Sequence, residues 1–114
     1  MPDAYDAIVA RDGAQVVGCA AVERYGASGL LRSVAVDGPR RGTGLGRRLT
    51  DAALAHARAH GVRTVYLLTE TAAGFFPRFG FHPIARDMVD PAVRASVEFT
   101  SACSDTALAM AKEL

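Results

Sequence analysis

The stretch Val34–Leu49 reads V-A-V-D-G-P-R-R-G-T-G-L-G-R-R-L, and it decides how the rest of the sequence is interpreted. An apolar run ends at the turn signal Asp37-Gly38-Pro39, and two arginines and three alternating glycines then lead into a helical pattern. This order predicts a strand, a phosphate-sized loop and a helix N-terminus. Unpaired N–H groups and the helix dipole favour an anion there, and the glycines let a ligand approach the backbone closely.

The spacing of this loop separates it from two common nucleotide-binding loops. A P-loop requires four residues between its glycines and then Gly-Lys-Ser/Thr, but no lysine is present in this stretch. A dinucleotide-binding loop requires G-x-G-x-x-G, but the third position after Gly44 is Arg47. The pattern that remains is Arg41-x-x-Gly44-x-Gly46. A glycine-rich turn that merely starts a helix is the alternative interpretation.

Composition limits the class of protein. The chain has 114 residues, of which 50% are hydrophobic and 22% charged, and a net charge of +1. This length predicts one domain, residues 1–114, and the charge balance gives no case for nucleic acid or an acidic membrane surface. Because we find neither a signal peptide nor an apolar run of roughly 18 residues, we expect a cytoplasmic protein. Cys19 and Cys103 are too few for a disulfide scaffold or metal cluster.

The remaining pattern predicts the order of strands and helices. Apolar runs predict three strands joined by tight turns, at Ala7–Arg11, Gln15–Tyr25 and Leu30–Val36. A helix from Thr43 or Gly44 to His60 and a buried strand at Thr64–Leu68 follow. We then expect a helix from Thr69 or Thr71 to Phe79, a strand at Phe81–Ala85 and a short helix at Asp90–Phe99. Ser104–Leu114 has the composition of a helix, but we favour a strand because the last strand of the sheet needs a neighbouring strand to pair with.

A second motif, Ala73-Gly-Phe-Phe-Pro-Arg-Phe-Gly-Phe81, stands at a suitable distance from the first. Together they resemble the GNAT family of N-acetyltransferases, in which an aromatic pair is followed by Leu-Gly-Phe where this chain has Phe79-Gly80-Phe81. The resemblance implies an α/β (α+β) fold with a mixed, mostly antiparallel sheet flanked by helices, lacking the usual N-terminal strand and two helices. Residues 67–76 and 84–99 further resemble small GNAT proteins found with arsenic-resistance genes.

The resemblance implies acetyl transfer from acetyl-CoA directly to a primary amine of a small molecule. The backbone of residues 41–47 would hold the pyrophosphate, the strand before it would pair with the pantetheine arm, and an N–H near Ala35 would polarise the thioester. The implied cofactor-binding residues are Val34, Ala35, Val36, Arg41, Gly42, Thr43, Gly44, Leu45, Gly46, Arg47 and Phe76. Many GNAT enzymes carry a tyrosine at the position of Phe76, where phenylalanine cannot protonate the departing thiolate.

Several side chains are candidates for the acceptor side. Glu70 and Glu23 are candidate bases for the incoming ammonium, and Ser33 is a candidate proton donor to the thiolate. Arg32 is expected on the same strand face as Val34, where it would bind an anionic acceptor. Surface acids and an exposed strand arginine are the alternatives that the sequence leaves open.

Three classes of function remain open from the sequence. The first is an N-acetyltransferase for a small amine, with an anionic amino acid analogue as the candidate acceptor. The second is an acyl-CoA-binding module without catalysis, and the third is an interaction protein with a structural glycine loop. We expect a homodimer, because a chain that lacks the usual N-terminal cover exposes apolar surface. We expect no metal, since His56 and His60 have metal-pair spacing but lack further ligands.

Overall fold

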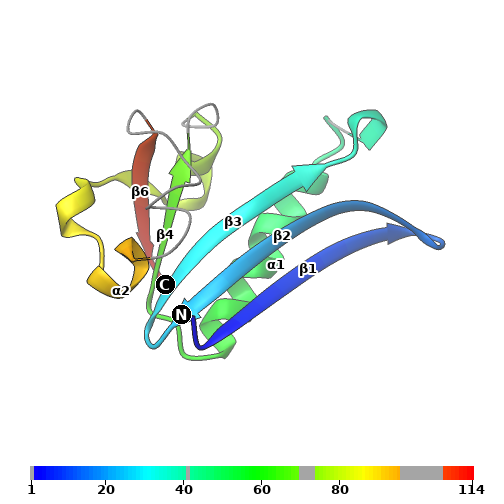
Figure 1. The fold of residues 1–114 in the computed structure, drawn as a ribbon. Coiled ribbons are helices and arrows are strands. Elements are labelled where there is room, and N and C mark those ends of the chain that lie inside the picture. The colour runs from blue at the N-terminus through cyan, green and yellow to red at the C-terminus, as the bar shows by residue number, and fades with distance from the viewer. Residues whose placement is uncertain (1, 41, 70–73, 96–106) are drawn as a thin grey trace.

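The computed structural model describes residues 2–40, 42–69, 74–95 and 107–114. The described strands form one sheet in the order β1-β2-β3-β4-β6-β5 (Figure 1). Neighbouring strands are antiparallel except for β3 and β4, which are parallel. The expected mixed, mostly antiparallel sheet is therefore confirmed. No described helix combines the length and the apolar character that crossing a membrane requires.

The first three strands form the expected antiparallel meander: β1 (Ala4–Asp12), β2 (Gln15–Tyr25) and β3 (Ser28–Val36). Tight turns join them, and their glycines Gly13 and Gly26 have positive φ. The predicted β2 is confirmed, whereas β1 begins three residues earlier than expected. Asp6 lies within β1 because its carboxylate accepts a hydrogen bond from Arg24 Nε at 2.7 Å. This cross-strand pair offsets the low strand propensity of an aspartate.

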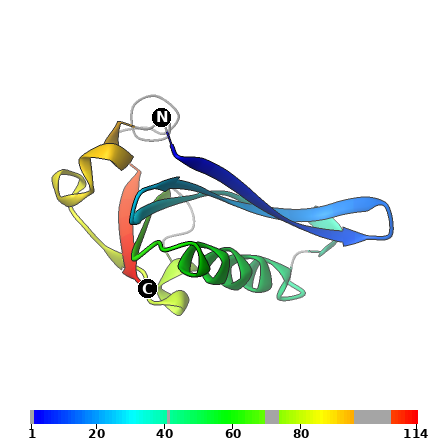
Figure 2. The ribbon, with the colours of Figure 1, turned by 90° about the horizontal axis from the view of Figure 1, so that it is seen from below.

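The helix α1 (Leu45–Ala59) covers one face of the meander (Figure 2). Its buried face consists of small and aliphatic residues with one threonine: Leu49, Thr50, Ala53, Leu54 and Ala57. The four apolar residues of this face pack with Ala20, Val22 and Leu31 of the sheet in one apolar cluster. The predicted helix is thus confirmed, and Gly61 follows it with φ 86°, as expected for a residue just past a helix end.

The second half of the chain contains β4 (Thr64–Thr69), β5 (His82–Pro83) and β6 (Leu108–Glu113). The final segment is a strand, as predicted: β6 pairs with β4 and β5. The strand predicted at Phe81–Ala85 is shorter than expected, since only the two residues of β5 pair with β6. Residues 104–106, where we expected this last strand to start, lie outside the described residues.

The predicted helices of this half are mostly short turns. The described part of the helix expected up to Phe79 is one 3-10 turn, η2 (Phe76–Phe79), which Gly80 ends with φ 92°. A further 3-10 turn, η3 (Arg86–Met88), precedes α2 (Pro91–Arg94). Asp90 caps α2 as predicted, with Oδ1 accepting from the Ala92 N–H at 3.0 Å. The rest of the helix predicted to Phe99 lies outside the described residues.

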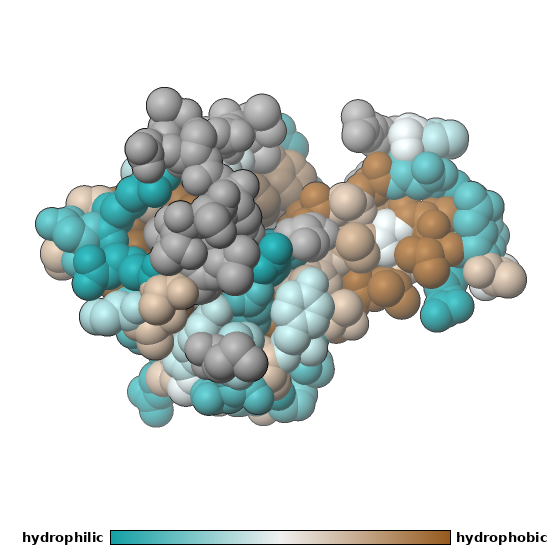
Figure 3. Space-filling model, viewed as in Figure 1, coloured by the Kyte–Doolittle hydropathy of each residue, from teal (hydrophilic) through white to brown (hydrophobic). Residues whose placement is uncertain are grey.

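The face of the sheet opposite α1 has a second, smaller apolar cluster. Val89 and Val93 pack there against Tyr25, Leu30 and Ala109. This cluster covers the part of the face near β4 and β6. Tyr5 and Val9 of β1 remain 55% and 46% exposed. Figure 3, which views this face, shows apolar atoms gathered toward the free end of the meander.

The cap of α2 gives a prediction about stability. Ser28 Oγ donates to Asp90 Oδ2 at 2.6 Å, and this bond, followed by the one from Ala92, lowers the pKa of Asp90 below its ordinary value of 3.8. A lowered pKa stabilises the folded state above pH 3.8, and this contribution is lost as the pH falls through the folded-state pKa. We predict that Asp90→Ala lowers the free energy of unfolding by about 1–2 kcal/mol at neutral pH.

Urea denaturation at neutral pH and near pH 3 would measure this effect. The loss should shrink at the lower pH, because protonation removes the interaction from the unmodified protein as well. Asp87→Ala, which removes an exposed acid in η3, is the matched control and should change stability by less than about 0.5 kcal/mol. An equal loss for Asp90→Ala at both pH values would contradict the assignment.

Candidate functional site

The strands β3 and β4 diverge, and the opening between them is the first feature of the site. They pair only from Ser28 to Leu30 and from Thr64 to Tyr66. Beyond these pairs β3 continues along β2 and β4 along β6, so the two strands separate toward their C-terminal ends (Figure 1). The described pairing with β4 thus ends before Leu31–Val36, the last part of β3. An opening in a sheet lets an extended ligand pair with strand backbone.

The glycine loop follows β3 and a 3-10 turn, η1 (Gly38–Arg40). Gly42 and Gly44 have φ angles of 79° and 82°, in the left-handed region that other residues rarely adopt. Thr43 Oγ1 donates a hydrogen bond to the Arg40 carbonyl at 2.5 Å, which closes the turn. The loop conformation therefore requires two of the three glycines that the sequence singled out.

The helix α1 starts at the end of this loop without a capping side chain. Gly44 is its N-cap, and the first turn contains no acidic residue. The first helical hydrogen bond runs from Arg48 N to the Gly44 carbonyl at 3.1 Å. The preceding N–H groups, from Leu45 to Arg47, therefore have no place in the helical ladder. They and the positive end of the helix dipole are available to an anion.

A cavity of about 350 Å³ lies at this helix start. It is lined by Val36, Arg40, Gly42, Gly44, Leu45, Gly46, Arg47, Phe75 and Arg78. Arg40 forms an ion pair with Asp12, whereas Arg47 and Arg78 have no ion pair with another described residue. The cavity thus combines backbone N–H groups with uncompensated positive charge. This combination suits a phosphate group.

The backbone can be approached closely at Gly46. An added Cβ would lie 3.6 Å from Val36 Cγ2 and 3.8 Å from Phe75 Cζ, which is ordinary van der Waals contact. All three residues line the cavity. A methyl group here would therefore occupy ligand space without disturbing the fold.

The aromatic residues of the second motif divide between the cavity and the core. Phe75 lines the cavity, whereas Phe76, expected at the cofactor, is only 7% exposed and packs in the α1-side core. The Phe76 ring contacts Phe75 at 5.1 Å and Phe81 at 5.8 Å between centroids. The structure thus corrects the expectation for Phe76: it supports the wall of the cavity, and Phe75 forms that wall.

An irregularity in the sheet sets the direction of the last β3 side chains. Cys19 pairs with Ala35 and Ala21 with Arg32, so the two residues Ser33 and Val34 oppose the single residue Ala20. This β-bulge interrupts the alternation of faces along β3. Val34 and Val36 therefore pack with the α1-side core, while Ala35 is exposed.

Arg32 consequently does not share a face with Val34, and that prediction is wrong. Arg32 lies on the face opposite α1, where its guanidinium contacts the Glu23 carboxylate at 2.6 Å. Glu23 is only 7% exposed and also accepts a hydrogen bond from the Tyr25 hydroxyl. Two predicted acceptor-side residues, Glu23 and Arg32, are thus brought together. Glu23 lies opposite Leu30, the last β3 residue that pairs with β4, and Arg32 lies two residues beyond it.

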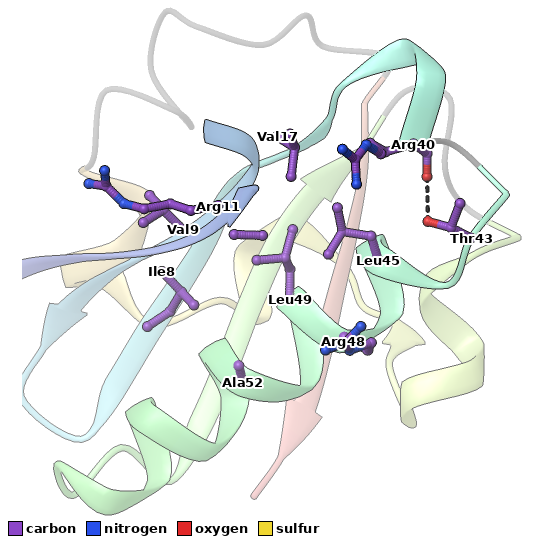
Figure 4. A pocket seen from close by; sticks show the side chains of 11 residues that line it. Ile8, Val9, Arg11, Val17, Arg40, Thr43, Leu45, Arg48, Leu49 and Ala52 are labelled. Atoms are coloured by element: carbon purple, nitrogen blue, oxygen red, sulfur yellow. Dashed lines mark hydrogen bonds between the residues drawn. The ribbon is translucent and has the colours of Figure 1, made fainter. Parts of the chain in front are cut away.

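A second hollow of about 570 Å³ lies between β1 and the first half of α1. Figure 4 shows Ile8 from β1 and Leu45 and Leu49 from α1 on its two sides. It shares Arg40 and Leu45 with the first cavity, so the two hollows flank the start of α1. The charged side chain of Arg11 points away from the helix in the same view.

The two histidines with metal-pair spacing contact each other, and His56 also contacts β1. Their rings lie 4.1 Å apart between centroids, and His56 Nε2 lies 3.4 Å from Asp6 Oδ2. In the part of the chain that the structure describes, we find no group of three or more potential ligands. The pair therefore joins α1 to β1 through Asp6.

Some predicted residues cannot be placed, and some lining residues were missed. Arg41 and Glu70 lie outside the described residues, and only the backbone of Ser33 is described. Arg40, Phe75 and Arg78 line the cavity although we did not predict them as cofactor-binding residues. Phe75 and Arg78 belong to the second motif, so the signal was present in the sequence. We interpreted this motif only as a sign of the family and did not predict which of its side chains line the cavity.

Comparison with known proteins agrees with this geometry. The family model described as "Acetyltransferase (GNAT) domain" matches residues 3–83. An amino-acid acetyltransferase of Azotobacter vinelandii is 38% identical over 92 residues, which are 79% of this chain and 21% of that protein. An uncharacterised N-acetyltransferase of Chlorobaculum tepidum is 37% identical over 83 residues, which are 72% of this chain and 53% of that protein.

Solved structures of two proteins have a similar fold. Rv2747 of Mycobacterium tuberculosis, in complex with CoA and NLQ, has a TM-score of 0.77 and 30% identity, covering 93% of this chain and 74% of that one. N-acetylglutamate synthase of Neisseria gonorrhoeae, complexed with coenzyme A and N-acetyl-glutamate, has a TM-score of 0.82 and 20% identity. The match covers 93% of this chain and 25% of that one. The chain spans about a fifth to a half of the length of the curated relatives cited above. It belongs to the GNAT acetyltransferase domain family.

Proposed function

We propose that the protein transfers the acetyl group of acetyl-CoA to the primary amine of a small molecule, and that the acceptor is an anionic amino acid or an analogue of one. The observation that carries the proposal is the opening between β3 and β4, which ends beside an uncapped helix start. The first offers strand edges to an extended pantetheine arm, and the second offers N–H groups to its pyrophosphate.

The donor side of the reaction depends mainly on backbone. In the proposal, the N–H groups around Gly44 and Gly46 hold the pyrophosphate, and Arg47 adds charge. Arg41 and Thr43 belong to the same loop. The backbone of Val34–Val36 pairs with the pantetheine arm, and an N–H near Ala35 donates to the thioester carbonyl. A donor aimed at the developing oxyanion contributes about 3 kcal/mol of transition-state stabilisation in well-studied enzymes.

In the transfer step, the neutral amine nitrogen attacks the thioester carbonyl carbon, and the carbon–sulfur bond breaks as the amide forms. The amine proton passes to a base, and the CoA thiolate takes up a proton. We propose Glu70, which follows the last residue of β4, as the base, and Glu23 as the second candidate. Ser33 is the proposed donor to the thiolate. Positioning of the two reactants contributes up to roughly 7–11 kcal/mol in ideal cases.

The acceptor side rests on Arg32. Its guanidinium is held by Glu23 beside the β3–β4 opening and its side chain is 24% exposed, so it can still reach a ligand carboxylate. The 38% and 35% identity to two proteins named amino-acid acetyltransferase supports an amino acid as the acceptor. The second candidate function is an acyl-CoA-binding module without transfer, because the described residues that line the cavity at the helix start include no tyrosine that could protonate the departing thiolate.

Thiol release tests the reaction itself. Acetyl-CoA is incubated with the protein and a panel of amines that includes acidic amino acids, an arsenic-bearing amino acid analogue, neutral amino acids and polyamines. We expect release of CoA to be fastest with an anionic acceptor. Binding of CoA in calorimetry without release above background for any amine would leave only the binding module. Absence of CoA binding at millimolar concentration would exclude both functions.

Gly46→Ala tests the donor site separately from the fold. The added methyl group would intrude on the cavity but not on the core, and alanine favours a helix over glycine by about 0.5–1 kcal/mol. We predict an unchanged or raised melting temperature and a Kd for CoA raised at least about tenfold, which is about 1.4 kcal/mol. Gly38→Ala, with open space around the added Cβ, is the matched control. An unchanged Kd in Gly46→Ala would refute the assigned pyrophosphate position.

Arg32→Gln tests the acceptor side. If the guanidinium binds the acceptor carboxylate, its loss should raise the KM for an acidic acceptor by roughly tenfold or more, corresponding to a lost charge-assisted hydrogen bond. The KM for a neutral amine and the Kd for CoA should change little. Arg63→Gln, which removes an exposed arginine next to β4, is the control. Equal effects on acidic and neutral acceptors would exclude Arg32 as the carboxylate receptor.

A further inference from the structure

The buried hydroxyl of Tyr25 acts on the same carboxylate that holds Arg32. Tyr25 donates a hydrogen bond to Oε1 of Glu23, and Nη1 of Arg32 donates to Oε2 at 2.6 Å. Both oxygens of this carboxylate are therefore engaged, one by a neutral donor and one by a cation. We propose that Tyr25 is a positioning residue, which holds the Glu23–Arg32 pair in the orientation that receives an acidic acceptor. This inference rests on the proposed function, in which Arg32 binds the acceptor carboxylate.

The pairing of β2 with β3 places these three side chains on one face of the sheet. Glu23 lies opposite Leu30, and Arg32 is two residues farther along β3. Tyr25 is two residues from Glu23 along β2, and residues at this spacing share a face. The diagonal separation of Glu23 and Arg32 is within the reach of long side chains. The hydroxyl, the carboxylate and the guanidinium thus form a row that runs toward the opening between β3 and β4.

The position of the Tyr25 hydroxyl is set by the packing of its ring. Tyr25 is 8% exposed and packs with Val89 and Val93 in the apolar cluster opposite α1. Ser28, which lies opposite Tyr25 in the β2–β3 register, donates a hydrogen bond to Asp90, the cap of α2, at this end of the sheet (Figure 1). Because the phenolic oxygen lies on the ring axis, a ring that is held by packing also holds its oxygen. The hydroxyl is therefore a fixed donor to Glu23.

This fixed donor prevents a different arrangement of the ion pair. A carboxylate commonly binds a guanidinium through both of its oxygens. Glu23 is only 7% exposed, so Oε1 would lose a hydrogen bond in a site with little access to water if the hydroxyl were absent. A second N–H of Arg32 is a donor that this oxygen could then recruit. The guanidinium would turn toward Glu23 and away from the acceptor carboxylate.

Tyr25→Phe tests the role of the hydroxyl, because it keeps the ring in its apolar cluster. We expect the KM for an acidic acceptor to rise about fivefold, the loss expected for one hydrogen bond. The kcat with that acceptor, the KM for a neutral amine and the Kd for CoA should change little, and the melting temperature should stay within a few degrees. An unchanged KM for the acidic acceptor, or equal rises for acidic and neutral acceptors, would overturn the proposal.

A double-mutant cycle with Arg32→Gln separates positioning from direct contact with the acceptor. If Tyr25 acts through Arg32, Tyr25→Phe should have no further effect on the KM for an acidic acceptor once Arg32 is replaced. Additive effects would show that the hydroxyl acts independently of Arg32 and would overturn the proposal.

Tyr5→Phe is the matched control. Tyr5 lies opposite Glu23 in the β1–β2 register, but it is 55% exposed. Its hydroxyl is not the one that donates to Glu23. The control should leave the KM for acidic and neutral acceptors unchanged. A rise equal to that in Tyr25→Phe would show that the effect does not depend on the hydroxyl that holds Glu23, which would also overturn the proposal.

Nuclear magnetic resonance of the arginine side chains tests the positioning without acceptor turnover. In isotopically labelled protein, the Nε–H signal of Arg32 is assigned by its loss in Arg32→Gln. We expect this signal to shift in Tyr25→Phe and to stay in place in Tyr5→Phe, because only the first change lets Glu23 turn. An unchanged signal in Tyr25→Phe would overturn the proposal. If the unmodified protein shows no preference for acidic acceptors, the proposed acceptor class is wrong, and a shifted signal still supports the hold of Tyr25 on the pair.

Discussion

The limited parallel pairing of β3 and β4 is the constraint on which the rest of the structure depends. Two parallel strands need a crossover connection, and here α1 supplies it across one face of the sheet. The crossover starts where β3 ends, so the N-terminus of α1 lies at the end of the sheet where β3 and β4 have separated. One topological requirement therefore brings together an open strand edge, a glycine loop and an uncapped helix start.

The separation of the two strands is maintained by their other partners. β4 pairs with β6 over its whole length, while β3 follows β2 through a bulge at Ser33 and Val34. On the α1 side, Phe76 and Phe81 belong to the apolar cluster that packs with both strands. On the other side, buried Glu23 holds Arg32 next to the opening. The opening between β3 and β4 is thus held by packing on both faces of the sheet. Apolar residues pack on the α1 side, and the Glu23–Arg32 ion pair lies on the opposite side.

Sequence patterns correctly predicted those elements whose structure is determined by residues close together in the sequence. The meander, the long helix and the glycine loop follow from turn residues and periodicity within a few residues. The start of β1 did not, because Asp6 is compensated by Arg24, 18 residues away. The face of Arg32 depends on a bulge that only the pairing register with β2 defines. The roles of Phe75 and Phe76 depend on a 3-10 turn where a regular helix was expected.

Local sequence patterns and contacts between distant residues determine different parts of the candidate site. The proposed donor side is built from backbone geometry, which glycines and a helix start encode locally, and a family resemblance therefore identifies it readily. The proposed acceptor side depends on a few side chains whose directions are set by the bulge and by the Glu23–Arg32 contact. A change of one residue in that contact alters the charge presented to an acceptor and leaves the helix start intact. Acceptor preference can therefore vary among related chains that share the same donor site.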